Sequence, residues 1–245
     1  MPAAVVAKTS KSSSDAVSVT TDPIDTTGAN AIILAYAVGG GTGATPTDSK
    51  GNTYTGLTAY QSGNVIKLWH CQNPIVGSGH TFSLSTGGGS FPCLAAIALS
   101  GMSTSALYDG EENGNTTGTG PSGSITPSVN RCLVVTACAM SSTTDSFVVD
   151  GSFVVQEHKP LVSGLAYGLG IAMFEQNPAA AIEATWTVAS LGPVTIASFR
   201  TVPGGGKGAG GGGKGNKGGG GVSVQQPGGA SFVAFNPGVD IGYGS

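Results

Sequence analysis

The stretch AIILAYAV at residues 31–38, followed by glycines at residues 39–41, decides the fold class of this chain. A short apolar run bounded by turn residues is typical of a β-strand whose two faces are both buried. The stretches CLAAIALSG at residues 93–101 and CLVVTACAM at residues 132–140 have the same character. We interpret all three as central strands, covered on one side by the core and on the other by small residues or a partner.

The rest of the chain repeats shorter versions of this pattern. Segments rich in Val, Ile, Thr, Phe and Tyr suit pleated, half-buried strands, and glycine-containing turns separate them about every 8–12 residues. This rhythm predicts an all-β fold, specifically an antiparallel, jelly-roll-like β-sandwich. No long helix is predicted, and residues 178–184 have room for a turn or two at most. The predicted strands are 3–8, 16–20, 31–38, 52–60, 65–71, 81–86, 93–101, 132–140, 146–157, 165–175, 182–189 and 194–201.

Charge is scarce and unevenly distributed. Charged residues make up 9% of the chain, whereas a typical soluble domain has about a quarter. Residues 1–202 contain seven Lys or Arg and twelve Asp or Glu, a balance of 7 − 12 = −5. No basic patch of the size that nucleic-acid binding requires is visible, so we expect no nucleic-acid partner. An uncharged surface suits a chain that neighbouring subunits partly cover.

The ends of the chain carry no targeting signal that we recognise. The first residues, MPAAVVAKTSKSSS, lack the basic start and apolar core of a secretory signal peptide. No run approaches the roughly 18 apolar residues that a membrane-spanning helix needs. We therefore expect synthesis in the cytoplasm and no membrane insertion, and the protein either stays there or leaves by a route other than a cleaved signal, such as cell lysis.

The composition divides the chain into three regions. We predict a β-sandwich body at residues 1–202, a glycine-rich linker at 203–221 and a C-terminal docking segment at 222–245. Residues 204–221 read GGGKGAGGGGKGNKGGGG, a sequence that cannot bury apolar surface and that predicts a flexible linker. The alternative is ordered packing of glycine helices from adjacent chains.

The docking segment reads VSVQQPGGASFVAFNPGVDIGYGS. Its apolar residues are too few for an independent core, yet a purely solvated tail has no need of them. We predict that it docks by strand addition, to its own body or to a neighbour. The predicted assembly residues are Val222, Val224, Phe232, Phe235, Ile241 and Tyr243.

The cysteines are Cys71, Cys93, Cys132 and Cys138. None belongs to a CxxC pair, and we interpret them as small apolar core residues, with a Cys71–Cys93 disulfide as the alternative. His70 and His80 flank a predicted hairpin and, with Cys71, form a weak candidate for a metal site. No spacing typical of metal ligands supports it, so we predict neither a metal nor another cofactor.

Polar residues of the loop at 109–124 are the main candidates for ligand binding. Glu111 and Glu112 are adjacent, so on an extended backbone they point in opposite directions and do not form a catalytic pair. A solvated loop is our interpretation, with calcium binding through oxygen ligands as the alternative. With three histidines and thirteen acids in the chain, little material exists for acid–base catalysis, and we predict no enzymatic activity. The residues of a candidate ligand or adhesion surface are Tyr108, Asp109, Glu111, Glu112 and, by aromatic stacking or else as a core residue, Trp69.

Four segments, in order along the chain, resemble a known domain. They are DTTGANAIILAYAV at residues 25–38, TDSKGNTY at 47–54, VIKLWHCQNP at 65–74 and ATWTVASLGPVTIASFR at 184–200. Together they resemble a jelly-roll-like domain of bacteriophage virion proteins, found in tail, fibre and decoration proteins and in some bacterial surface proteins. The resemblance covers residues 15–201. Within TDSKGNTY we expect a turn in which Asp48 caps the backbone, Gly51 adopts a positive φ and Asn52 leads into the next strand.

The resemblance implies a virion-associated protein that decorates a particle or meets a host surface. We therefore expect a non-enzymatic structural component of a bacteriophage particle, in the tail or fibre or on the capsid exterior, made in the host cytoplasm. It would assemble as an oligomer, with its own copies and other virion proteins as partners. The alternative is a carbohydrate-binding or host-adhesion module that recognises a surface glycan. The glycine-rich linker and docking segment lie outside the resemblance and are loosely similar to glycine-rich regions of tail fibres and adhesins.

Overall fold

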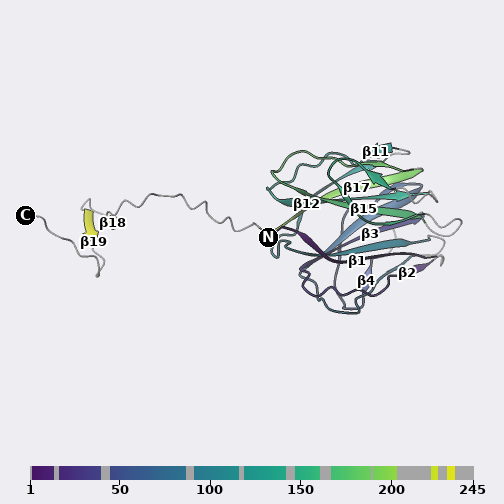
Figure 1. Cartoon of the computed structure of the whole chain (residues 1–245), viewed down its shortest axis with the longest axis horizontal. Coiled ribbons are helices and arrows are strands. Elements are labelled where there is room, and N and C mark those ends of the chain that lie inside the picture. The colour runs from purple at the N-terminus through teal and green to yellow at the C-terminus, as the bar shows by residue number, and fades with distance from the viewer. Residues whose placement is uncertain are drawn as a thin grey trace, which may run out of the picture. The chain divides into compact units, whose positions relative to one another are not determined.

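A computed structural model gives the fold of the chain (Figure 1). It describes residues 2–13, 17–39, 45–86, 91–115, 119–141, 147–160, 167–188, 190–202, 222–225 and 231–234. Residues Met1–Gly204 form one compact unit and Gly205–Ser245 a second. Among the described residues there are strands and turns but no helix, so the prediction of an all-β fold is confirmed. No helix long and apolar enough to cross a membrane occurs in this part of the chain.

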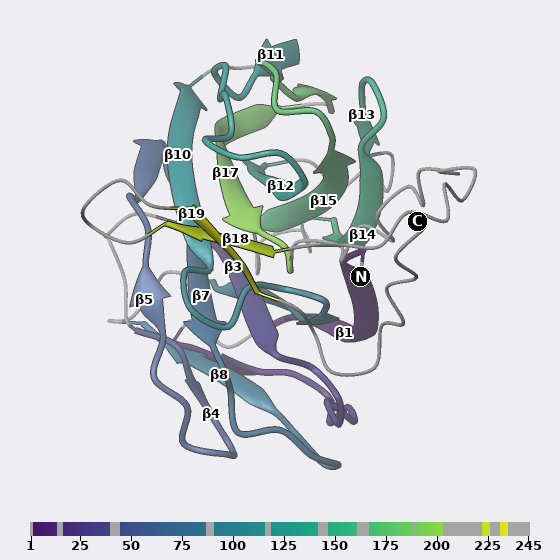
Figure 2. The ribbon, with the colours of Figure 1, turned by 90° about the vertical axis from the view of Figure 1, so that its left-hand side faces the viewer.

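Two large antiparallel sheets, here called the main sheets, form the centre of the body. The first main sheet has the order β1 (Ala4–Ser12), β9 (Cys93–Ser100), β3 (Ala31–Gly39), β7 (Asn64–Gln72), β5 (Thr55–Gly56), with β6 (Tyr60–Ser62) also paired to β7. The second main sheet has the order β10 (Tyr108–Asn115), β17 (Leu191–Arg200), β12 (Cys132–Met140), β15 (Gly168–Gln176), β14 (Val154–Lys159). Figure 2 shows the two main sheets one above the other.

Two three-stranded sheets, here called the outer sheets, complete the sandwich. The first contains β2 (Ser18–Thr20), β8 (Phe82–Ser85) and β4 (Thr47–Asp48), with β8 in the middle. The second contains β11 (Thr119–Pro121), β16 (Thr185–Thr187) and β13 (Val148–Val149), with β16 in the middle. Each outer sheet packs on the outward face of one main sheet, so the body has four layers.

Three apolar cores lie between these four layers. Ile33 and Leu68 belong to the central core between the main sheets. Ile32 and Leu34, on the opposite face of the same strand as Ile33, pack against Phe82 of the first outer sheet. A third core lies under the second outer sheet. The prediction that these strands are buried on both faces is therefore confirmed, and the second face is covered by a sheet of the same chain rather than by a partner.

The two halves of the body have the same topology. The first half, residues 2–102, has the sheet orders β1-β9-β3-β7-β5 and β2-β8-β4. The second half, residues 103–202, has the orders β10-β17-β12-β15-β14 and β11-β16-β13, which match the first half strand for strand except that β6 has no counterpart. Each half exchanges strands between its two sheets as a jelly roll does. The body is thus two jelly rolls joined through their main sheets, where the sequence predicted one.

Individual hydrogen bonds repeat between the halves. In the first half the Thr21 amide donates to Phe82 O at 2.9 Å, and the Phe82 amide donates to Thr21 Oγ1 at 3.1 Å. In the second half the Ser122 amide donates to Ala184 O at 2.9 Å, and the Ala184 amide donates to Ser122 Oγ at 3.0 Å. A hydroxyl residue therefore holds the outer sheet in the same way twice.

The pairing register repeats as well. β3 and β7 are joined over nine residue pairs, beginning with Ala31 opposite Gln72. β12 and β15 are also joined over nine pairs, beginning with Cys132 opposite Gln176. Both glutamines begin the sequence Gln-Asn-Pro. Outside such short matches the two halves have little sequence similarity, so the repeat is not visible in the sequence alone.

Several predicted boundaries are wrong. β10 lies where we predicted a solvated loop at 109–124, and the predicted strand 146–157 is two strands, β13 and β14, separated by a turn at Gly151 with φ of 68°. The predicted turn at Gly51 is confirmed, with φ of 77°. All four cysteines are buried and unpaired, so the alternative of a Cys71–Cys93 disulfide is wrong.

The described residues of the C-terminal unit form an antiparallel hairpin. β18 (Val222–Gln225) pairs with β19 (Ser231–Ala234). The predicted linker at 203–221 lies outside the described residues, as do three predicted assembly residues, Phe235, Ile241 and Tyr243.

Candidate functional site

Asp109, predicted on a ligand-binding loop, is an internal residue. Its side chain is 1% exposed. Oδ2 accepts hydrogen bonds from the Ser128 amide at 2.8 Å and from Ser198 Oγ at 2.9 Å, and Oδ1 accepts from Arg200 Nε at 3.0 Å and from Ser128 Oγ. Burial raises the pKa of Asp109, but these hydrogen bonds outweigh it and hold the pKa below its ordinary value. Asp109 thus joins β10 to β17 and to the turn before β12.

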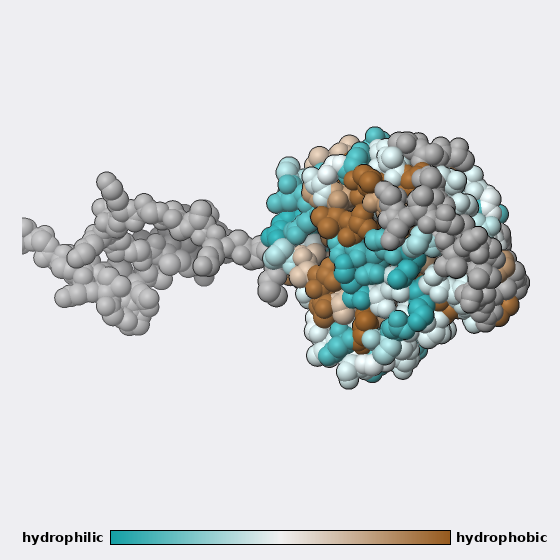
Figure 3. Space-filling view, turned by 45° about the vertical axis from the view of Figure 1, so that its right-hand side comes forward, coloured by the Kyte–Doolittle hydropathy of each residue, from teal (hydrophilic) through white to brown (hydrophobic). Residues whose placement is uncertain are grey.

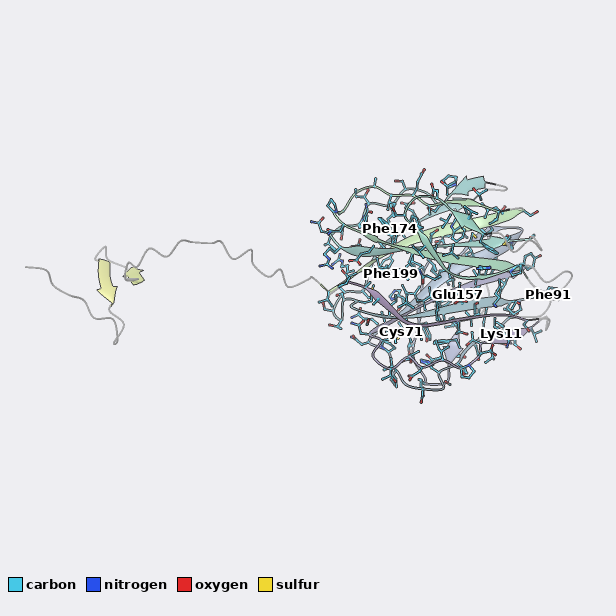
Figure 4. All side chains as sticks on the ribbon, viewed as in Figure 1. Lys11, Cys71, Phe91, Glu157, Phe174 and Phe199 are labelled. Carbon is cyan, nitrogen blue, oxygen red and sulfur yellow. The ribbon has the colours of Figure 1, made fainter. Side chains whose placement is uncertain are left out.

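Glu111 links the two main sheets at one edge. Its carboxylate accepts hydrogen bonds from the amide and the hydroxyl of Thr58, both at 2.9 Å. At the opposite edge, Ser10 of β1 donates to Glu157 of β14 at 2.5 Å, and Lys8 Nζ lies 3.9 Å from the same carboxylate. Glu157 is labelled in Figure 4. Glu111 and Glu157 therefore each join an edge strand of the second main sheet to the first half of the body.

Tyr108 is the exposed member of an aromatic group. The residue is 39% exposed, and its ring stacks on the His70 imidazole with centroids 5.8 Å apart and planes 4° apart. Both rings meet the edge or face of Phe199, a buried residue of the central core that is labelled in Figure 4. Burial lowers the pKa of His70, which favours the neutral imidazole. The sequence did not indicate that His70, 38 residues away, supports Tyr108.

Trp69 does not join this group. It lies in the core under the first outer sheet and is 7% exposed. Lys67 Nζ lies 4.1 Å from the centre of the Trp69 ring, in the geometry of a cation–π interaction. A Cβ at Gly56 would lie 2.7 Å from Trp69 Cζ3, so only glycine fits beside the ring. The core interpretation of Trp69, one of the two left open by the sequence, is the one that the structure supports.

The predicted adhesion residues therefore separate into three places. Tyr108 and Glu112 lie on β10 and reach solvent, Asp109 and Glu111 are bonded to neighbouring segments, and Trp69 packs in a core. A surface that combines Trp69 with Tyr108 does not exist in this fold.

A further buried polar cluster lies under the TDSKGNTY motif, around Asp48. The Asp48 side chain is fully buried. Its Oδ2 accepts from Tyr54 Oη at 2.5 Å and from Asn52 Nδ2 at 2.8 Å, and its Oδ1 accepts from the amides of Lys50 at 2.9 Å and Asn52 at 3.1 Å. Asp48 caps the turn as predicted from the motif. The same carboxylate also holds the strand that follows the turn through Tyr54.

The cluster continues through His80 to Thr26. His80 Nε2 lies 3.0 Å from Asp48 Oδ2, although the two atoms are not aligned as a hydrogen bond. His80 Nδ1 lies 2.9 Å from Thr26 Oγ1. A hydroxyl, an imidazole and a carboxylate in this order resemble the relay of a nucleophilic enzyme. Thr26 and His80 are both completely buried, however, and the Thr26 hydroxyl is bonded to the backbone of Gly77 at 3.1 and 3.2 Å. In this arrangement the cluster ties the first outer sheet together.

Acid should weaken the fold through Asp48. Burial alone would raise the pKa of Asp48, but the hydrogen bonds from Tyr54 and Asn52 and the contact with His80 lower it from 3.8 to about 2. Because the folded-state pKa is below the unfolded one, the ionised carboxylate stabilises the fold above about pH 4, and this contribution is lost as the pH falls toward 2. We expect the free energy of unfolding, measured with denaturant, to fall between about pH 5 and about pH 2.5. This fall should be smaller for an Asp48→Asn variant than for the natural chain. Equal losses in the two proteins would contradict this assignment.

Among the described residues, no three His, Cys, Asp or Glu side chains converge as a metal site. In particular, His70 packs on Tyr108 and His80 contacts Asp48, so these two histidines do not meet with Cys71. No protein-family model, no characterised protein and no solved structure matches this chain.

Proposed function

We propose that this protein is a non-enzymatic structural component of a bacteriophage particle that assembles with copies of itself. The observation that carries the proposal is the organisation of the chain. A double jelly roll whose sheets cover one another is followed by a glycine-rich sequence and a separate hairpin, β18–β19. Jelly rolls occur in viral capsid proteins and in lectins. The order of the GAN, DSKGNTY and ATWT segments, which resembles virion proteins, favours the first of these.

The internal hydrogen bonds of the acidic residues of the body support a structural role. Asp48 and Asp109 are buried and accept several internal hydrogen bonds each, while Glu111 and Glu157 bind the two halves together. Carboxylates that accept hydrogen bonds from other parts of the same chain stabilise its fold. The proposed location is the tail, the fibre or the capsid exterior, and the proposed partners are further copies and other virion proteins.

Host-glycan binding is the second candidate, and it rests on Tyr108. The ring of Tyr108 is open to solvent and its orientation is supported by His70, as a sugar-stacking residue requires. Trp69 does not contribute, because Lys67 covers its ring. One open aromatic ring is a small platform, so we favour the structural role.

The exposed apolar residues that the structure describes on the body do not form one broad face. On the face shown in Figure 3, hydrophobic residues form separate patches among hydrophilic ones. The exposed large apolar residues of the described body are spread over several strands and loops. They are Val5, Val17, Ile75, Tyr108, Val129, Val148 and Val154. We therefore assign self-association to residues 203–245 rather than to the sandwich.

Removal of the C-terminal region should abolish assembly. We expect light scattering to give a multimer for the full chain and a monomer for a chain that ends at Val202, the last described residue of the body. Circular dichroism of the shortened chain provides the control that the sandwich is intact. A full chain that stays monomeric at high concentration would contradict the proposed function and favour a single adhesion module.

A further inference from the structure

Two tyrosines lie along the edge of the body where β6 and β10 are neighbours. Tyr60 begins β6 and pairs with Ile66 of β7, whereas Tyr108 begins β10 and stacks on His70 of the same strand β7. Positions 66 and 70 are separated along β7 by about 13 Å, the length of four residues of a strand. The two tyrosines therefore form a row along one edge of the sandwich, with one ring from each half of the body.

The neighbours of each tyrosine fix its position. Tyr60 is partly buried and packs against the central core. Tyr108 contacts the parallel ring of His70 and, at an angle of 68°, the ring of Phe199. Because His70 stacks on one face of Tyr108, the opposite face is the one available to a ligand. Side chains that are already held in place lose little conformational freedom when a ligand binds.

The Glu111 carboxylate lies near both tyrosines. It accepts hydrogen bonds from the amide and the hydroxyl of Thr58, two residues before Tyr60. Burial raises the pKa of Tyr60 and of Tyr108, and the Glu111 carboxylate raises the pKa of both further. Each carboxylate oxygen accepts more than one hydrogen bond, so Glu111 is able to accept another from a hydroxyl group of a ligand.

The charges at this edge favour a ligand without negative charge. Glu112 of β10 is exposed and, like Glu111, raises the pKa of Tyr60. Lys67 also interacts with Glu111, but its Nζ lies over the Trp69 ring. An acidic ligand placed on the two tyrosines would therefore meet two carboxylates, and like charges repel.

We propose that this edge binds a neutral oligosaccharide, with one sugar stacked on Tyr108, another on Tyr60 and a hydroxyl group donated to Glu111. This inference rests on the second candidate function, host-glycan binding, and names its ligand class and a second contact ring. A sugar ring has an apolar face that stacks on an aromatic ring and hydroxyl groups that bind polar side chains. Since a single sugar reaches only one of the two tyrosines, an oligosaccharide should bind more tightly than its monosaccharide.

Isothermal titration calorimetry of the full-length chain tests the ligand class. The probes are the neutral trisaccharides of glucose, galactose and N-acetylglucosamine, the matching monosaccharides, and the acidic trisaccharide of galacturonic acid. We expect at least one neutral trisaccharide to bind, its monosaccharide to bind more weakly and the acidic trisaccharide not to bind. These comparisons use the natural chain, so they do not depend on the folding of a variant.

Substitutions of the two tyrosines test the contact rings. Tyr108→Ala and Tyr60→Ala should each weaken binding of the neutral trisaccharide by about tenfold, because each removes one stacking ring. The matched controls Tyr108→Phe and Tyr60→Phe keep the rings and should bind nearly as well as the natural chain. Thermal unfolding checks that each variant is folded.

The outcomes separate this inference from the proposed functions. If no neutral trisaccharide binds, the inference and the glycan-binding candidate are both overturned, while light scattering of the shortened chain still decides the structural role. If Tyr108→Ala abolishes binding and Tyr60→Ala leaves it unchanged, the second contact ring is wrong and glycan binding at Tyr108 remains. Equally tight binding of the acidic trisaccharide overturns the ligand class.

Discussion

Replacement of Asp48 by alanine should lower the free energy of unfolding of the body by about 3–5 kcal/mol, because it removes the charged acceptor of several buried hydrogen bonds, each of which contributes about 1.5–3 kcal/mol. The carboxylate is fully buried and is 3.0 Å from His80 Nε2. It also accepts the Tyr54 hydroxyl at 2.5 Å and Asn52 Nδ2 at 2.8 Å. Alanine would leave these groups without an acceptor inside the sandwich, and each buried unsatisfied group adds to the loss. Denaturant unfolding near neutral pH measures the effect.

The matched control is Asp25→Ala. Asp25 also accepts two local hydrogen bonds, from the amide and hydroxyl of Thr27, but it lies on the surface. Water replaces its contacts, so the midpoint of unfolding should hardly change. If Asp48→Ala were as mild as Asp25→Ala, the Asp48 cluster would contribute little to stability, and the assignment of a structural role would be wrong.

Comparison of the two halves of the body shows that the Asp48 cluster is not required for the topology. The Ile24–His80 bridge of the first half corresponds to the Ile125–Ile182 bridge of the second, so isoleucine stands where the first half has His80. The same topology therefore forms without a buried imidazole. A buried ionic cluster is often no more stabilising than apolar packing, and its effect here is to fix one arrangement of the TDSKGNTY turn against the first outer sheet.

The sequence predicted those elements whose apolar residues report directly on burial. The runs at residues 31–38, 93–101 and 132–140 are central strands, and Gly51 has the positive φ that its turn requires. β10 was missed because its sequence, YDGEENGN, has the glycine and acidic residues of a loop. Pairing with β17 and the internal hydrogen bonds of Asp109 make it a strand. Tertiary contacts of this kind override local propensity.

The candidate sites could not be read from spacing, because their members are distant along the chain. Thr26, Asp48 and His80 are brought together only by pairing of the first outer sheet and the adjacent bridge at Ile24. Three strands of the outer sheets were predicted, within residues 16–20, 81–86 and 182–189, but strands of two to four residues do not indicate that they form separate sheets over the main sheets. A partner therefore remained one of the alternatives for covering the outward faces of the main sheets.

Replacement of Trp186 by alanine should have a comparable effect in the other half, about 3–5 kcal/mol. Trp186 is completely buried under the second outer sheet. Its Nε1 donates to Thr136 Oγ1 at 2.9 Å, and a Cβ at Gly170 would lie 2.9 Å from its ring, so the ring fills the space that glycine leaves. Trp186→Phe keeps most of the apolar contact and loses the hydrogen bond, and we expect a loss of about 1–2 kcal/mol. If Trp186→Phe lost as much unfolding free energy as Trp186→Ala, this would contradict the assignment of the effect to apolar packing of the ring.

Together the Asp48 and Trp186 variants test whether the two jelly rolls fold as one. Their outer cores are separate, but residues of both halves, such as Ile33 and Val135, share the central core. Neither main sheet can keep its inner face buried if the other unfolds. Asp48→Ala and Trp186→Ala should therefore shift one and the same unfolding transition, seen alike by tryptophan fluorescence and circular dichroism. Two separated transitions, each sensitive to only one variant, would show instead that the halves are independently stable and that the shared core is a weak contact.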